Sequence, residues 1–337
     1  MDCHFVSLLA MTDIEMTKIL KATKDIDQAV KLLLEEDVIA LPTETVYGLA
    51  GLASSEKAIR KIYEIKNRPA INPLISHYAS IDEIKKDVVV TELAEKLLKK
   101  FSPGPLTLVL KRKADSRISK LACADLDTAA VRIPNHKLCL EVLRGVKIPL
   151  VAPSANPSGR LSPVSADNVA KMFQGKLDYV LDGGVCEVGL ESTVIAVEAD
   201  TVTILRFGAV TVEDLLSVVS EVKIPERNEP IRSPGMLLKH YAPTCPIRKG
   251  IDNPREGEAL LAFGDITGSE HGFKLVKNLS ERGNLEEAAA NFFKMIHEFE
   301  EAAVSGISVM EIPRYGIGQA INDRLERAVN AARHCEE

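Results

Sequence analysis

Apolar residues recur along the chain in two spacings, one typical of amphipathic helices and one typical of short buried strands. Helical spacing is found in residues 25–34, 59–65, 91–101 and 166–173. Short apolar runs predict strands at 38–41, 106–110, 128–134, 149–152, 178–181, 192–197 and 202–205. Only Glu198-Ala199-Asp200 separates the last two runs, which predicts a hairpin. This alternation of helices and strands indicates an α/β domain.

The composition changes after residue 222. Residues 225–246 hold five prolines, and this composition is typical of a linker rather than of a packed core. Strands predicted at 259–263 and 307–312 then alternate with helices at 285–302 and 320–332, which indicates a small α/β unit with a mostly parallel sheet. We therefore predict four segments: an N-terminal extension (1–22), a large domain (23–222), a proline-rich linker (223–246) and a small C-terminal domain (247–337).

Composition and charge exclude several classes of protein. Of the 337 residues, 4% are aromatic and none is Trp, which argues against a stacking platform for single-stranded nucleic acid. The net charge of −6 argues against a protein that coats nucleic acid through bulk electrostatics. Six scattered cysteines without a Cys-x-x-Cys pair are typical of free thiols in a reducing compartment. No apolar run approaches the ~20 residues of a membrane span. We expect a cytoplasmic protein.

The N-terminal stretch offers no targeting signal. An apolar run covers residues 5–11, but Asp2 precedes it and no basic segment or small-residue cleavage site frames it. A signal peptide is therefore not expected, and either Met11 or Met16 is an alternative start to Met1.

The most informative polar stretch is Lys66-Asn67-Arg68-Pro69-Ala70-Ile71-Asn72-Pro73-Leu74-Ile75-Ser76-His77, directly after a predicted helix. Its two prolines end that helix, so Lys66 and Arg68 are expected at a helix end or in a loop. Alone, two such cations are typical of a solvated helix end. Four other polar motifs, however, lie at strand ends, where open α/β sheets bind ligands: residues 41–49, 152–159, 191–194 and 205–208.

Together these five motifs resemble the threonylcarbamoyl-AMP synthase family in its long, two-domain form, from about Thr23 onward. The resemblance implies a twisted, open mixed sheet with helices for the large catalytic domain and a smaller Rossmann-like α/β domain at the C-terminal end. It also implies a reaction in which L-threonine, bicarbonate or carbon dioxide, and ATP give L-threonylcarbamoyladenylate and pyrophosphate. A separate tRNA-modifying transferase complex would then receive this product and modify an adenosine beside the anticodon.

The resemblance also assigns residues. Lys66 and Arg68 would be catalytic, acting on the charge of the triphosphate. The residues that would bind ATP are Lys66, Arg68, Asn72, Thr128, Ser154, Asn156, Ser162, Arg206 and Tyr241. Those that would bind threonine are Thr43, His77, Arg132, Ala152 and Ser192. Magnesium is expected with ATP, held by substrate oxygens and water rather than by protein ligands. The linker, which contains His240 and Tyr241, is expected to act as a lid over the nucleotide.

Two alternatives remain open at this point. The basic residues between Lys96 and Lys120 are typical of a solvated face, but they also suit a rim that makes a weak contact with tRNA, as in an RNA-binding module without synthase activity. A carbamoyltransfer enzyme on the same fold is the other alternative, and it would be expected to carry additional cysteine clusters. The chain has no Gly-x-x-x-x-Gly-Lys-Ser/Thr motif, and Gly316-Ile317-Gly318 is interpreted as the start of a helix.

Overall fold

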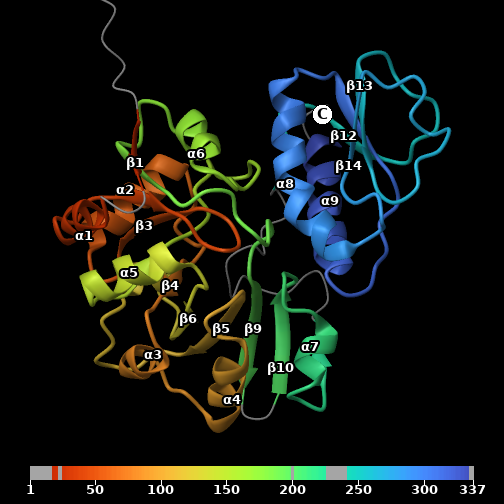
Figure 1. Cartoon of the computed structure of the whole chain (residues 1–337). Helices are drawn as coiled ribbons and strands as arrows, with labels where there is room; N and C mark the ends of the chain where they lie inside the picture. Colours follow the sequence, from red (N-terminus) through yellow and green to blue (C-terminus); the bar gives the residue numbers. More distant parts are fainter. Residues whose placement is uncertain (1–16, 22–24, 199–200, 225–240, 334–337) are drawn as a thin grey trace, which may run out of the picture.

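The computed structural model describes residues 17–21, 25–198, 201–224 and 241–333. Residues up to 224 build a large domain around a mixed sheet in the order β1-β8-β2-β3-β7-β4-β6-β5-β9-β10-β11 (Figure 1). Its strands are β1 (Lys18–Lys21), β2 (Ile39–Leu41), β3 (Gly48–Leu52), β4 (Ile75–His77), β5 (Leu106–Lys111), β6 (Thr128–Arg132), β7 (Leu150–Val151), β8 (Tyr179–Asp182), β9 (Thr193–Glu198), β10 (Thr201–Arg206) and β11 (Val222–Lys223). Its helices are α1 (Ile26–Leu34), α2 (Glu56–Lys66), α3 (Ile81–Asp87), α4 (Glu92–Phe101), α5 (Lys137–Val146), α6 (Ala166–Met172) and α7 (Val212–Leu216), with a 3₁₀ turn at Lys120–Cys123.

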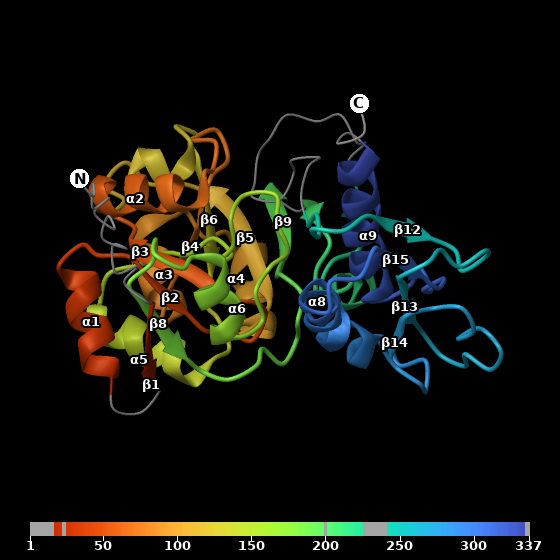
Figure 2. The same cartoon turned by 90° about the horizontal axis from the view of Figure 1, so that it is seen from above.

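The C-terminal residues form a second, smaller α/β domain. Its sheet has the order β12-β15-β13-β14, and every strand pair in it is parallel. The strands are β12 (Ile247–Lys249), β13 (Glu258–Ala262), β14 (Leu275–Asn278) and β15 (Gly306–Val309), and the helices are α8 (Leu285–Glu301) and α9 (Gly318–Arg333). In both views α8 lies on the side of this sheet that faces the large domain (Figures 1 and 2). No helix in the described ranges is long and apolar enough to cross a membrane.

These observations confirm the predicted fold class. The β9/β10 hairpin is antiparallel, and the small sheet is parallel, as the apolar pattern indicates. The large sheet, however, begins at β1, inside the segment predicted as an N-terminal extension, because β1 pairs with β8 along four residues. The segment 225–240, most of the predicted linker, lies outside the described residues.

Three elements of the large domain have weak signals in the sequence. All five residues of β3 are buried, so the strand lacks the alternation that marks a half-exposed strand. Its Gly51 packs closely on α2, since a Cβ there would lie 3.0 Å from the Cβ of Ala58. The other two elements are β4, which has three residues, and α3, which is a helix of seven residues.

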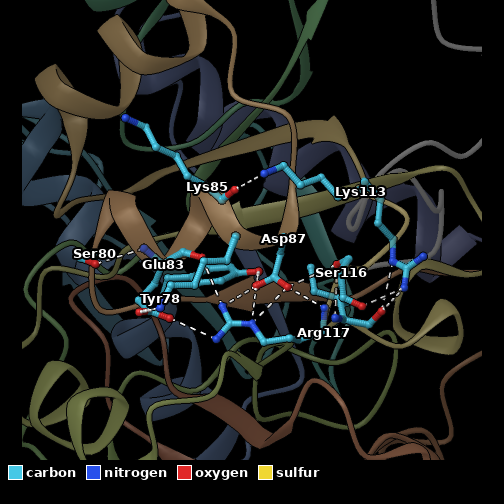
Figure 3. A network of polar contacts seen from close by, with 11 residues as sticks. Tyr78, Ser80, Glu83, Lys85, Asp87, Lys113, Ser116 and Arg117 are labelled. Atoms are coloured by element: carbon cyan, nitrogen blue, oxygen red, sulfur yellow. Dashed lines mark hydrogen bonds and ion pairs between the residues drawn. The ribbon is translucent and has the colours of Figure 1, made fainter.

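The basic stretch between Lys96 and Lys120 is largely engaged in contacts within the protein. Lys96 and Lys99 form ion pairs with Glu92 and Glu95 on the same helix, and the Arg112 guanidinium donates to the carbonyls of Ser116 and Ile118. Figure 3 shows the most extensive of these contacts, in which Arg117 meets a fully buried Asp87 at the end of α3.

Asp87 is the centre of this network (Figure 3). Its carboxylate accepts hydrogen bonds from the backbone N–H of Arg117 at 2.6 Å, from the Arg117 guanidinium at 2.6–3.2 Å and from the Tyr78 hydroxyl at 3.1 Å. Arg117 also forms an ion pair with Glu83 at 3.1 Å. Here a cation has two carboxylate partners, so the network ties the loop before the 3₁₀ turn to α3.

Candidate functional site

The polar motifs of the large domain meet at one pocket. Eight residues predicted to bind a substrate line it: Thr43, Arg68, His77, Arg132, Ala152, Ser154, Ser192 and Arg206. Thr45, Val46, Gly48 and Glu191 are among its other lining residues. Motifs that are far apart in the chain thus meet where the strands of the large sheet end, as expected for an open α/β sheet.

Strand register places His77 beside Arg132. The two residues are partners in the parallel pair of β4 and β6, and both are buried. On the other side of β4, the N–H of Ala152 donates to the carbonyl of Ile75 at 3.0 Å, so the end of β7 lies next to the same position. Gly48 allows this close approach, because a Cβ there would lie 3.0 Å from the Cβ of Ala152.

Helix α2 carries Lys66 to the pocket wall. Ser55 caps its N-terminus, accepting from the N–H of Ala58, and its buried face includes Ile59, Ile62 and Tyr63. The helix ends at Asn67 in the left-handed conformation, two residues before Pro69. Because this stop is local, the helix end fixes the direction in which the buried Lys66 side chain leaves it.

The Lys66 ammonium is held by the backbone of the Ser154–Gly159 loop rather than by a carboxylate. Its Nζ donates to the carbonyls of Ser154 and Asn156, each at 2.5 Å, and the N–H of Ser158 donates to the Lys66 carbonyl at 2.7 Å. Burial and the nearby Arg68 hold the pKa of Lys66 well below its usual range. Lys66 therefore shapes the loop that carries Ser154.

Two buried arginines extend this cationic wall. The Arg68 guanidinium donates to the carbonyls of Asn72 and Pro73, and that of Arg206 donates to the carbonyl and hydroxyl of Ser192. Burial lowers the pKa of Arg68 to about 10, and it also lowers that of Arg206. Within the described ranges, no ion pair joins Lys66, Arg68 or Arg206 to a carboxylate. Buried cations without such a partner are costly, so their arrangement is suited to an anionic ligand.

The opposite wall combines one paired cation with neutral groups. Arg132 forms an ion pair with the buried Glu44 at 2.8 Å and donates through Nε to the carbonyl of Gly104. Burial, together with Arg132, lowers the pKa of His77 to about 3, so its imidazole is neutral at pH 7. The Thr43 hydroxyl donates to the carbonyl of Val46 and accepts from nearby backbone N–H groups.

Six predicted site residues do not line the pocket. Lys66 and Asn156 lie behind the pocket wall, where the Asn156 amide donates to the carbonyls of Pro157 and Arg160. Asn72 is buried, and its side-chain amide has no hydrogen-bond partner among the residues described. The three others are Ser162, Tyr241 and Thr128.

Ser162 and Tyr241 belong to the interface with the small domain. The Ser162 hydroxyl donates to Glu191 at 2.5 Å, while the buried Tyr241 ring packs against Phe293 of α8, with ring centroids 5.7 Å apart. Thr128 is the first residue of β6 and Arg132 is the last, so Thr128 lies at the far end of that strand from the pocket. Its role as a nucleotide ligand stays a prediction.

Sequence reasoning missed three charged residues at this site. Glu44 and Glu191 lie inside the polar motifs, but no role was expected for either. Arg324, on α9, is fully buried and contacts Glu191. No local pattern marks Arg324, because it stands between Asp323 and Leu325 in an ordinary amphipathic helix. It pairs with the neighbouring Asp323 at 3.0 Å, and its contact with Glu191 forms only across the domain interface.

An α/β sheet with a pocket at its strand ends, lined by buried arginines without carboxylate partners, is typical of the class of proteins that bind an anionic substrate. The family model described as telomere recombination (Sua5_yciO_yrdC) matches residues 31–208, and that described as threonylcarbamoyl-AMP synthase, C-terminal domain (Sua5_C), matches residues 210–330. The chain belongs to the threonylcarbamoyl-AMP synthase family.

Relatives with known names span almost the whole chain. The threonylcarbamoyl-AMP synthase of Bacillus subtilis is 38% identical over 321 residues, covering 90% of this chain and 92% of its own. That of Pyrococcus abyssi is 36% identical over 321 residues, covering 89% and 92%. Among solved structures, P. abyssi Sua5 complexed with L-threonine superposes with a TM-score of 0.85 at 32% identity, covering 94% of this chain and 98% of its own.

Proposed function

We propose that this protein synthesises L-threonylcarbamoyladenylate from L-threonine, bicarbonate or carbon dioxide, and ATP, with release of pyrophosphate. The observation that carries this proposal is a pair of buried arginines without carboxylate partners, Arg68 and Arg206, in a pocket that Thr43 and His77 also line. Lys66 lies behind these arginines and holds the loop that carries Ser154. A triphosphate supplies the negative charge that the two arginines lack. The names of the relatives and the L-threonine bound to P. abyssi Sua5 support the same reaction.

Threonine would occupy the half of the pocket formed by β4 and β6. Arg132 would receive its carboxylate, since a guanidinium forms strong, directional hydrogen bonds with carboxylates. Thr43, His77, Ser192 and the backbone of Ala152 would contact the rest of the molecule. A neutral His77 would act as a hydrogen-bonding group, and with a pKa of about 3 it is a weak base at neutral pH.

The bond changes in the reaction balance without a covalent enzyme intermediate. The threonine nitrogen bonds to the carbon of carbon dioxide and loses a proton, which gives a carbamate. A carbamate oxygen then bonds to the α-phosphorus of ATP, the bond from that phosphorus to the bridging oxygen breaks, and pyrophosphate leaves with the electron pair. Arg68 and Arg206 would stabilise the charge that develops on the phosphates, with Lys66 fixing the Ser154 loop beside them.

Magnesium would enter with ATP. Across the residues described, no group of three His, Cys, Asp or Glu side chains is placed to hold a metal ion. The pocket carboxylate Glu191 is paired with Arg324, and Glu44, next to the lining residues Thr43 and Thr45, is paired with Arg132. These residues suit an ion held by phosphate oxygens and water, which is how Mg²⁺ commonly binds to nucleotides.

The product would pass to a tRNA-modifying transferase complex in the cytoplasm. A direct contact with tRNA is less well supported, because many cations between Lys96 and Lys120 are already engaged with Glu92, Glu95, Asp87 or backbone carbonyls. An RNA-binding module without synthase activity would have no use for the unpaired cations in the pocket. The adenylate synthase is therefore the function that we favour.

The proposal is tested by measuring ATP-dependent pyrophosphate release with threonine, 2-aminobutyrate or valine, each with and without bicarbonate. Release should require bicarbonate, and the specificity constant for threonine should exceed those of the two analogues about 100-fold or more, because a pocket that bonds a hydroxyl rejects ligands without one. Equal specificity constants for the three amino acids would contradict our assignment of the threonine half.

A further inference from the structure

The interface between the two domains contains a buried ion pair, and one member of this pair lines the pocket. Arg324 is the largest of the fully buried side chains in the described part of the chain. Its Nε and Nη2 lie 3.1 and 3.0 Å from Oε2 of Glu191, which lines the pocket of the large domain. A residue of α9 in the small domain thus neutralises a carboxylate of the catalytic domain.

Glu191 connects Arg324 to Ser162 and, through the adjacent Ser192, to Arg206. Ser162 and Arg206 are both predicted to bind ATP. The other oxygen of Glu191, Oε1, accepts the hydroxyl of Ser162 at 2.5 Å. The next residue, Ser192, accepts hydrogen bonds from Arg206 through its carbonyl and hydroxyl. The position and charge of Glu191 therefore bear directly on the wall that faces the nucleotide.

Arg324 also supports the aromatic side of the interface. Its guanidinium lies 5.0 Å from the centroid of the Tyr241 ring, within the range of a cation–π contact. The same ring packs on Phe293 of α8. One arginine thus fixes a pocket carboxylate and the described end of the linker.

Glu191 places a negative charge in the pocket, and Arg324 neutralises that charge. A bare carboxylate in the wall of a site for a polyanion would repel the ligand, and repulsion between like charges is strong where water is excluded. We propose that Arg324 is a positioning residue of the ATP site, which cancels the charge of Glu191 and holds Glu191 against Ser162. The small domain would thereby be required for tight ATP binding, and this inference rests on ATP being the anionic substrate.

The test is an ATP titration by calorimetry of four intact proteins: the wild type, Arg324→Met, Glu191→Gln and the double variant. Arg324→Met should bind ATP about tenfold more weakly or worse, because it exposes the charge of Glu191. Glu191→Gln completes the cycle, and it should weaken ATP binding less than Arg324→Met does, because it leaves no negative charge facing the nucleotide. The double variant should return to within about threefold of the wild type, because a neutral pair replaces an ion pair.

Arg160→Met is the matched control, since it removes an ion pair with Glu300 across the same interface that does not reach Glu191. Its ATP affinity should equal that of the wild type. If Arg160→Met weakens binding as much as Arg324→Met, or if Glu191→Gln does not restore binding to Arg324→Met, the charge-cancelling role is wrong. The double variant remains informative if Arg324→Met fails to fold. No ATP binding by the wild type would instead contradict the proposed function itself.

Discussion

Two groups of cations in the large domain, one half-buried and one buried, have opposite environments. Arg117 lies against Asp87 and Glu83, in a network that satisfies it with two carboxylates (Figure 3). Arg68 and Arg206, in contrast, donate only to backbone carbonyls and one hydroxyl in the interactions described, and the pKa of each is lowered by burial. The hydrogen bonds from Arg117 to Asp87 raise the pKa of Arg117, and with the charge of Asp87 they outweigh the lowering caused by partial burial.

The presence or absence of a carboxylate partner distinguishes cations that stabilise the fold from cations that are suited to bind an anionic ligand. A buried charge with a bonded partner contributes to stability chiefly because removing one member leaves the other exposed to a low dielectric. A buried charge without a partner costs free energy until a ligand of opposite charge arrives. Proteins retain such locally unfavourable groups mainly at functional sites. The two groups should therefore respond in opposite ways to substitution.

The largest effect is expected on catalysis. Arg68→Met and Lys66→Met should each lower kcat/KM for adenylate formation about 100-fold or more, which corresponds to about 3 kcal/mol. Arg68→Met removes a cation that lines the pocket, and Lys66→Met releases the loop that carries Ser154. Pyrophosphate release at saturating threonine measures this loss. Turnover close to the wild type in both variants would show that these cations do not act on the triphosphate.

The next effect is on stability. Asp87→Asn should lower the free energy of unfolding by about 2 kcal/mol, since it weakens the bonds to Arg117 and Tyr78 while keeping the shape of the side chain. The specificity constant of the folded protein should stay within about twofold of the wild type. Denaturant unfolding and pyrophosphate release on the same sample check both statements. A catalytic defect without a loss of stability would reverse the roles assigned to the two groups.

The smallest effect concerns pH. The pKa of Lys66 in the folded protein is lowered relative to the unfolded chain, where it is about 10.4. Below the folded pKa the cost of burying the charge is fully present. As pH rises from the folded pKa toward about 10.4, the unfolded state binds more protons, so the wild type gains stability. Melting temperatures across the alkaline range should therefore rise for the wild type relative to Lys66→Met. Parallel curves for the two proteins would contradict a lowered pKa.

Much of the fold follows from local patterns in the sequence. The hairpin of β9 and β10 and the elements β13, α8, β15 and α9 were predicted because their apolar spacing is regular, whereas β12 and β14 were not predicted. In contrast, β1 has only four residues and is ordered by its pairing with β8, some 160 residues further along the chain. The four residues of β1 contain no signal from which its pairing with such a distant strand could be predicted.

In the candidate site, too, features set by local sequence were predicted and features set by long-range packing were not. Motifs such as residues 66–77 group polar side chains at a helix or strand end, and the predicted residues Thr43, His77 and Arg132 do line one pocket. The sequence alone does not distinguish a cation with a carboxylate partner from one without, because Arg117 and Arg68 both follow short polar or basic stretches. Only the packing of α3 and α2 separates them. Arg324 was missed for a related reason, since Glu191, the partner that links it to the pocket, belongs to the other domain.

The most direct test of this distinction is a set of melting curves with and without saturating ATP for the wild type, Arg68→Met and Asp87→Asn. Our account predicts that Arg68→Met melts close to the wild type without ATP but loses most of the upward shift that ATP causes in the wild type. Asp87→Asn should melt at a lower temperature and keep the full shift. If Arg68→Met melts as low as Asp87→Asn and still shifts fully with ATP, the unpaired cations of the pocket hold the fold rather than the ligand.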